Sequence, residues 1–288
     1  MGDGAYTDAE HAIAIGNNSK ALGHNSVSIG RNNKAGVGKY GGSESVAIGT
    51  RDTTLDDRSM AAGYGNVADE ESYAIGYGNK AMNFSSTSIG RKNKVIGSYS
   101  VALGRKNQSG TKWTHKGAIT IGQYDTVTTQ GGIAIGNNAF ATDKGGTGGH
   151  SIAIGRQVQA IDDYALATGY KSSSENFASI AMGYGDTASS AYSVAIGDQN
   201  KASGRYSIAM GNENFTDDWH AVAFGNKNKA SGKASIAMGS KNFTDGWYAV
   251  TMGRWDTATK EGAVAIGFNN NASANYTLSL GLLNQATK

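Results

Sequence analysis

The side chains that could carry metal or nucleophilic chemistry are few in this sequence. It has no cysteine, and its histidines are scattered as His11, His24, His115, His150 and His220. None of them lies in an HExxH segment, and none is spaced to converge with a second candidate ligand, whereas a metal site needs three or four. No G-x-S-x-G elbow stands beside a triad. These residues predict no metal and no cofactor, and they favour a protein that is not an enzyme.

The composition indicates a thin core rather than a deep one. Of 288 residues, 42 are Gly, none is Pro, and only 39% are hydrophobic, so large apolar side chains are scarce. The net charge is +3 with both signs interspersed, which gives no nucleic-acid footprint. No apolar run approaches the length of a membrane span, and residues 1–4 do not open a signal peptide. If the protein is exported, we expect its signal and anchor to lie outside this sequence.

A short phrase recurs along the whole chain and ends each time in a glycine. We call this residue the marker glycine, and from Gly155 to Gly281 every interval between markers is fourteen residues. Internal repetition of this kind outranks any local propensity. The nineteen markers are Gly16, Gly30, Gly49, Gly63, Gly76, Gly90, Gly104, Gly122, Gly136, Gly155, Gly169, Gly183, Gly197, Gly211, Gly225, Gly239, Gly253, Gly267 and Gly281.

The phrase itself predicts a β-strand. In residues 193–197 the branched Val194 and Ile196 alternate with small residues before the corner at Gly197, and Ile208 and Gly211 repeat the pattern. Period-two alternation places the branched and the small residues on opposite faces. Neither face carries a charge, so we expect both to be buried. Periodicity alone leaves open which face points inward.

A second, shorter strand is predicted after each corner. The position five residues past the marker, Ala202 in this copy, is Ala in twelve copies and Ser, Thr or Val in the others. It must therefore face a narrow interior. Three residues past the marker, Asn or Asp occurs in fifteen of nineteen copies, as at Asn200, and stacked Asn side chains form ladders. Each fourteen-residue coil thus has two strands and two corners.

The domain prediction follows from this repeat. Residues 1–288 form a single all-β repeat domain of about 19 coils, with insertions near 36–44, 108–116 and 143–150. One strand face lies inside the coil, and self-association around an axis would cover the other.

The phrases SVAIG, SIAIG and SIAMG, each followed by an xxNxA segment, resemble the YadA-like head of trimeric autotransporter adhesins over nearly the whole chain. The resemblance implies a left-handed parallel β-roll packed as a homotrimer on the surface of a Gram-negative bacterium. It also implies adhesion to host receptors or to extracellular matrix proteins, and an outer-membrane anchor in the full-length protein. The neck, stalk and anchor of the family are not expected within residues 1–288, and no heptads follow Gly281.

Some heads of this family bind collagen through repeated NSVAIG phrases. The nearest phrases here are residues 25–30, 44–49 and 192–197, and none of them matches fully. The incomplete match weighs against collagen. By analogy with other adhesins, it leaves an immunoglobulin-like receptor of the CEACAM family as an equal alternative.

Candidate ligand-binding residues lie where the repeat is broken, because insertions map to exposed loops. A second group of candidates comes from FTDDW at 215–219, which returns as FTDGW at 243–247. Exposed aromatic residues are favoured binding anchors. The candidates are Lys39, Tyr40, Lys112, Trp113, His115, Lys116, Trp219 and Trp247. Alternatively, the insertions are merely tolerated or pack over a neighbouring chain, and the aromatic residues seal a corner between coils.

Two other functions compete with adhesion. Left-handed β-helix acyltransferases are also trimeric, but their coils repeat in hexapeptides, so a fourteen-residue period argues against them. A purely structural fibre or spacer segment is compatible with everything in the sequence. An ice-binding solenoid would show a regular T-x-T ladder, whereas Thr120 and Thr251 belong to no such ladder.

Overall fold

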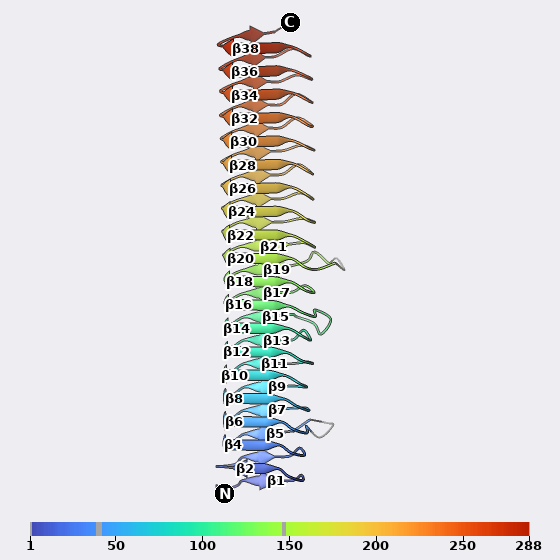
Figure 1. Ribbon diagram of the computed structural model, residues 1–288, viewed down its shortest axis with the longest axis vertical. Coiled ribbons are helices and arrows are strands. Elements are labelled where there is room, and N and C mark those ends of the chain that lie inside the picture. The colour runs from blue at the N-terminus through green and yellow to red at the C-terminus, as the bar shows by residue number, and fades with distance from the viewer. Residues whose placement is uncertain (1, 39–41, 146–147, 288) are drawn as a thin grey trace. The chain divides into compact units, whose positions relative to one another are not determined.

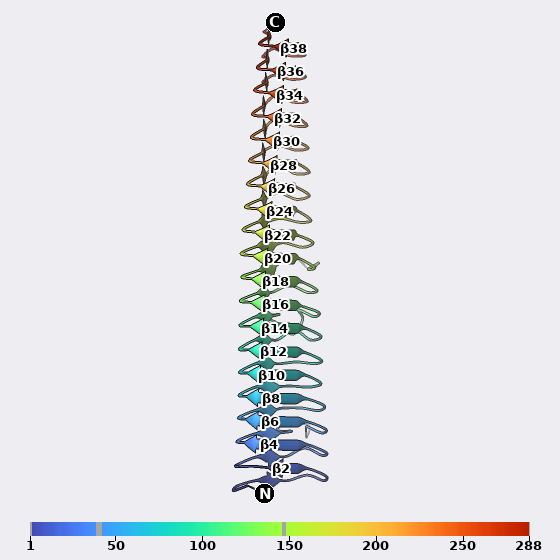
Figure 2. The ribbon, with the colours of Figure 1, turned by 60° about the vertical axis from the view of Figure 1, so that its left-hand side comes forward.

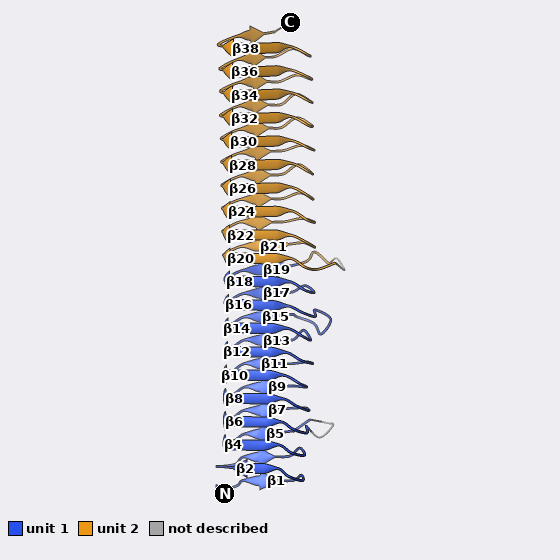
Figure 3. Ribbon diagram, in the orientation of Figure 1, with its two compact units in different colours: residues 1–142 blue, residues 143–288 orange. Residues whose placement is uncertain are grey.

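The structure is a computed structural model that describes residues 2–38, 42–145 and 148–287. The predicted candidates Lys39 and Tyr40 lie outside the described residues. The described chain consists of β-strands joined by turns, and it divides into two compact units, residues 1–142 and 143–288 (Figure 3). A membrane-crossing helix is not found anywhere in the described ranges. The prediction of a single repeat domain stays a prediction.

In unit 1, long strands alternate with short ones (Figure 1). The long strands are β2 (Ile13–Ile15), β4 (Val27–Arg31), β6 (Val46–Thr50), β8 (Met60–Tyr64), β10 (Tyr73–Tyr77), β12 (Thr87–Arg91), β14 (Val101–Arg105), β16 (Ile119–Gln123) and β18 (Ile133–Asn137). The short strands are β1 (Tyr6–Thr7), β3 (Lys20–Ala21), β5 (Lys34–Ala35), β7 (Thr53–Thr54), β9 (Val67–Ala68), β11 (Lys80–Ala81), β13 (Lys94–Val95), β15 (Gln108–Ser109), β17 (Thr126–Val127) and β19 (Phe140–Thr142).

Unit 2 repeats the alternation. Its long strands are β20 (Ile152–Arg156), β22 (Leu166–Tyr170), β24 (Ile180–Tyr184), β26 (Val194–Asp198), β28 (Ile208–Asn212), β30 (Val222–Asn226), β32 (Ile236–Ser240), β34 (Val250–Arg254), β36 (Val264–Phe268) and β38 (Leu278–Leu282). Its short strands are β21 (Gln159–Ile161), β23 (Ser173–Ser174), β25 (Thr187–Ala188), β27 (Lys201–Ala202), β29 (Phe215–Thr216), β31 (Lys229–Ala230), β33 (Phe243–Thr244), β35 (Thr257–Ala258), β37 (Asn271–Ala272) and β39 (Gln285–Ala286).

Within each unit the long strands stack into one parallel sheet and the short strands into a second, which makes each unit a parallel β-solenoid. Gly197 pairs with Gly211, fourteen residues on, and Val194 pairs with Ile208. Figure 2 shows the connecting segments of successive coils stacked over one another within each unit. The predicted all-β coil of about 14 residues with two strands is confirmed.

The insertions of unit 1 leave the strand register intact. Val27 pairs with Val46 although nineteen residues separate them, and Val101 pairs with Ile119 across eighteen. The additional residues therefore project from the coil instead of shifting the ladder, as expected for surface loops.

The small side chains fill the interior, which answers the question that periodicity left open. Ala195 and Ala202 are fully buried and belong to one cluster of alanines across consecutive coils. Val194 and Ile196 point away from the interior and stay partly exposed. In the single chain, the expectation that both strand faces are buried therefore holds only for the small-residue face.

Buried amides hold one corner of each coil together. The Asn200 Nδ2 lies 2.9 Å from Asp186 Oδ1 and 2.8 Å from the carbonyl oxygen of Gly211. The Asn200 Oδ1 in turn accepts a hydrogen bond from the backbone N–H of Asn214 at 3.0 Å. The predicted ladder of stacked Asn side chains is confirmed, and it satisfies backbone groups that burial would otherwise leave unpaired.

The marker glycines allow the chain to turn directly beside the neighbouring coil. Gly197 has a φ of 132°, and a Cβ built on it would lie 2.0 Å from the carbonyl oxygen of Gly211. Gly49 has a φ of 128° and the same close approach, at 2.1 Å to Gly63 O. A side chain at either position would force two coils apart, so the marker is a steric requirement.

Candidate functional site

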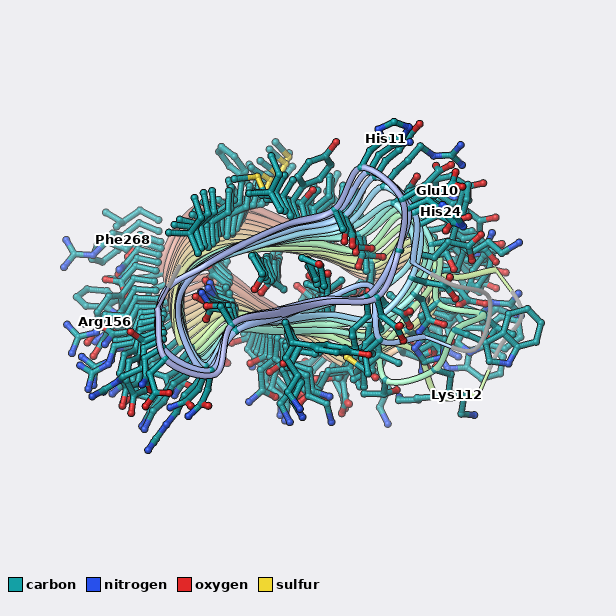
Figure 4. All side chains as sticks on the ribbon, turned by 90° about the horizontal axis from the view of Figure 1, so that it is seen from below. Glu10, His11, His24, Lys112, Arg156 and Phe268 are labelled. Carbon is teal, nitrogen blue, oxygen red and sulfur yellow. The ribbon has the colours of Figure 1, made fainter. Side chains whose placement is uncertain are left out.

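The insertion after β15 brings four predicted residues into one turn of unit 1. The His115 backbone N–H donates to the Lys112 carbonyl oxygen at 3.1 Å, and the Lys116 N–H donates to Thr114 O at 2.9 Å. Thr111 closes the turn, with its backbone N 3.3 Å from His115 Nδ1. Figure 4 shows Lys112 extending outward from this loop.

The same turn displays the most exposed tryptophan of the described chain. Trp113 is 64% exposed, and Lys112 and Lys116 of the same turn are exposed as well. A turn that displays an exposed indole and two cations suits protein or glycan contact.

Trp219 and Trp247 lie in unit 2, at the corner that precedes the long strands. They are 50% and 57% exposed. They lie two coils apart, and the intervening coil places Lys233 between them in the repeat. The Lys233 Nζ lies 5.9 Å from the centre of the Trp247 ring, and the Arg205 guanidinium lies 5.8 Å from that of Trp219. Each indole is therefore paired with a cation.

Next to these tryptophans runs a row of stacked rings. Tyr192 and Tyr206 are parallel with ring centres 4.9 Å apart, and Tyr206 stacks on His220 at 5.1 Å. Phe177 continues the row with an edge contact to Tyr192 at 5.4 Å. Rings from successive coils therefore pack against one another along this corner. His220 serves as a stacking partner within the row.

The residues of the row that begin each corner adopt left-handed backbone conformations. Tyr192, Tyr206 and His220 have φ values of 57–58°, which is uncommon for residues other than Gly, Asn and Asp. This backbone geometry points the rings outward, so that the rings of successive coils stack on one another.

A different corner, which the sequence reasoning did not single out, carries a dense group of cations in unit 1. The residues one and two positions past the marker are Arg91 and Lys92 in one coil and Arg105 and Lys106 in the next. Strand pairing sets Arg91 against Arg105. The sequence does contain a signal for this group of cations, because the segment RKN occurs at 91–93 and again at 105–107, each time directly after a marker glycine.

The corresponding corner of unit 2 mixes both charges. Arg156 lies 5.5 Å from the ring centre of Tyr170, and Figure 4 shows Arg156 and Phe268 projecting from this corner. Asp198 is also found there, and Glu213 forms an ion pair of 3.3 Å with Lys227.

Four positions of the ladder carry an aspartate, which can ionise, in place of a neutral asparagine. They are Asp52, Asp125, Asp186 and Asp256. Burial raises the pKa of Asp125 from 3.8 to about 6, against the opposing effect of hydrogen bonds from the backbone N–H groups of Ala139 and Gly136. Burial likewise raises the pKa of Asp52 and that of Asp186. These groups lie inside the coil, so they bear on stability and not on ligand contact.

Among the described residues, no group of three or more His, Cys, Asp and Glu side chains is placed to hold a metal ion. What the exposed corners offer is non-covalent: aromatic faces, cations and loop backbone. The arrangement suits recognition of another molecule.

Comparison with known families shows which family the repeat resembles. The family described as YadA head domain repeat (2 copies) matches more than half of the chain. The matched segments are residues 1–35, 84–107, 130–157, 147–172, 188–214, 220–242 and 258–282. A comparison with curated proteins gives no match.

Proposed function

This chain belongs to the YadA head family, and from that premise we propose that it is the head of a trimeric autotransporter adhesin. In this proposal three copies, each a left-handed parallel β-roll, pack as a homotrimer on the surface of a Gram-negative bacterium, anchored in the outer membrane through the rest of the full-length protein. The head attaches the cell to a host receptor or an extracellular matrix protein and catalyses no reaction.

The outward face of the long strands carries the proposal. In unit 2 this face presents Val194 and Ile196 in one coil and Ile208 and Met210 in the next, all partly exposed. In both units the first and third residues of every long strand, which point outward before the marker glycine, are uncharged. An uncharged and mainly apolar face of this kind marks an association surface. Identical chains that pack these faces around a common axis would bury it.

Trimerisation would also multiply every exposed corner by three. A weak site on one chain would then gain avidity from simultaneous engagement of several receptors. The turn with Trp113 in unit 1 and the indoles Trp219 and Trp247 in unit 2 supply candidate contacts, because exposed aromatic anchors dominate binding energy at protein interfaces.

The test is a binding panel with the purified protein. Collagen, fibronectin, laminin and several immunoglobulin-like epithelial ectodomains, CEACAM-type receptors included, are immobilised and probed with wild type. A deletion of residues 111–116 and the double variant Trp219→Ala, Trp247→Ala are run in parallel. We expect saturable binding to at least one ligand and its loss in one of the two variants.

A control separates loss of contact from loss of fold. Circular dichroism and the thermal midpoint of each variant should match wild type, since both sets of residues lie on exposed corners. If a folded wild-type protein binds nothing in the panel and does not attach to host cells, the adhesin proposal fails and a structural fibre segment is the better explanation.

A further inference from the structure

One surface of unit 1 concentrates positive charge without compensation. We call it the basic strip, and it comprises Tyr77, Arg91, Lys92, Arg105, Lys106 and Tyr124. Strand pairing aligns Tyr77 with Arg91 and Arg91 with Arg105. The six side chains are exposed, and the four cations come from two consecutive coils.

Backbone geometry fixes the outward direction of the strip. Lys92, Lys106 and Tyr124 have φ values of 55–60°, so the chain turns sharply at each of them. The ladder nevertheless continues around the corner, because the Lys106 N–H donates to Arg91 O at 2.9 Å and the Tyr124 N–H donates to Arg105 O at 3.0 Å. The cations are therefore held about 4.8 Å apart along the coil axis.

Two tyrosines border the cations. The Arg91 guanidinium lies 5.6 Å from the ring centre of Tyr77, and the Lys106 Nζ lies 4.9 Å from that of Tyr124. The Tyr124 hydroxyl also accepts from Arg105 Nη2 and from Lys106 Nζ, each at 3.3 Å. These cations lower the pKa of Tyr124, with the hydrogen bond from Lys106 as the largest cause. The rings lessen the mutual repulsion of four cations but do not neutralise it.

At these corners of unit 1, no exposed carboxylate among the described residues neutralises the positive charge. At the described corner positions one to four residues past each marker in unit 1, the only acidic residues are Asp52 and Asp125. Both are buried in the amide ladder. Lys80 and Lys94, paired on the adjacent short strands, add further positive charge to the neighbouring face.

We propose that the basic strip binds a linear sulfated polysaccharide of the host surface. Arg and Lys side chains bind sulfate and carboxylate groups, with the Arg guanidinium offering a bidentate fork. The bordering tyrosine rings provide flat apolar faces for sugar rings. The strip from Tyr77 to Tyr124 spans four coils, about 14 Å, so it is long enough to contact several consecutive sugar units of an extended polysaccharide. This inference rests on the proposed adhesin function, which places the strip outside the cell, where such chains occur.

The probe is immobilised heparin, with N- and O-desulfated heparin and double-stranded DNA as alternative polyanions. The tested variant is Arg91→Gln, Lys92→Gln, Arg105→Gln, Lys106→Gln. We expect wild type to bind heparin with an affinity that falls steeply with salt, to lose binding on desulfation, and to be weakened at least about tenfold by the four substitutions.

A matched variant controls for net charge. Lys201→Gln, Lys227→Gln, Lys229→Gln, Lys241→Gln removes the same number of exposed cations from the mixed surface of unit 2. It should retain heparin affinity within about twofold if the strip, and not overall charge, is responsible. Equal losses in both variants would overturn the proposal, and DNA binding as tight as heparin binding would assign the strip to polyanions in general.

The protein panel distinguishes this inference from the function on which it depends. A wild-type head that attaches to host cells but ignores heparin refutes the polysaccharide site alone. A head that binds heparin but attaches to no cell, even one rich in sulfated chains, refutes the adhesin function alone.

Discussion

At the scale of single residues, the ladder carboxylates set the pH dependence of stability. The native pKa of Asp125, about 6, lies above the ordinary 3.8, so the folded state holds its proton more tightly than the unfolded state does. Binding of this proton stabilises the folded state fully below about pH 4. That contribution is lost as the pH rises toward 6, and above pH 6 the stability no longer depends on Asp125 protonation. We expect Asp125→Asn to reduce that slope, to which Asp52 and Asp186 also contribute, and to raise the melting temperature at pH 8. Thermal unfolding from pH 4 to 8 measures both.

The reverse substitution tests the same reasoning. Asn228 Nδ2 lies 2.9 Å from Phe224 O and 2.8 Å from Gly239 O, and its Oδ1 accepts from the Asn242 N–H. Asn228→Asp replaces two buried donors with a buried charge, and we expect it to cost more than about 3 kcal/mol at pH 8. The loss should shrink at pH 4.5, where the carboxyl regains a proton. A variant as stable as wild type at both pH values would contradict the structural role of the ladder.

At the scale of the coil element, the marker glycine is a steric requirement and a neighbouring glycine is not. Gly197→Ala would place its Cβ 2.0 Å from Gly211 O, whereas Gly185→Ala, at a φ of 65°, meets nothing closer than 3.5 Å. We expect the first to cost more than about 3 kcal/mol and the second only about 1 kcal/mol, the penalty of a left-handed alanine. Chemical denaturation of the two variants gives the comparison, and equal costs would refute it.

Most of the coil could be predicted from the sequence because its constraints are local and repeated. Gly197 marks the corner, Ala202 marks the narrow interior, and Asn200 marks the ladder, each by type and spacing. The direction of Val194 and Ile196 could not be predicted, since an alternating strand with two uncharged faces fits either orientation. It took the structure to show that the methyl groups of Ala195 fill the interior and that the branched side chains lie outside.

The candidate sites were less predictable than the coil. Trp113, Trp219 and Trp247 were identified because insertions and exposed aromatic residues are conspicuous in a sequence. The basic strip was missed because its cations are distributed over two copies of the repeat. They form a surface only when strand pairing sets Arg91 against Arg105. A signal of this kind depends on register, and an overall net charge of +3 conceals it.

At the scale of the whole molecule, the apolar outward face predicts the oligomeric state. Met182, Ile196 and Met210 lie on this face in three consecutive coils of unit 2 and are at least partly exposed. We expect Met182→Glu, Ile196→Glu, Met210→Glu to convert the proposed homotrimer into monomers, because three carboxylates in each chain would have to be desolvated at the interface. Light scattering coupled to size-exclusion chromatography measures the mass.

The control for this experiment uses the outward side of the short strands in the same coils, which is not uniformly apolar. Thr187→Glu, Lys201→Glu and Phe215→Glu alter the outward side of the short strands, which presents Lys201 to solvent. This variant should remain trimeric, since in these three coils the residues before the marker glycine are apolar only on the long-strand face. If the control dissociates while the long-strand variant stays trimeric, the chains associate through the short strands. If wild type is itself a folded monomer, the apolar face serves some contact other than self-association.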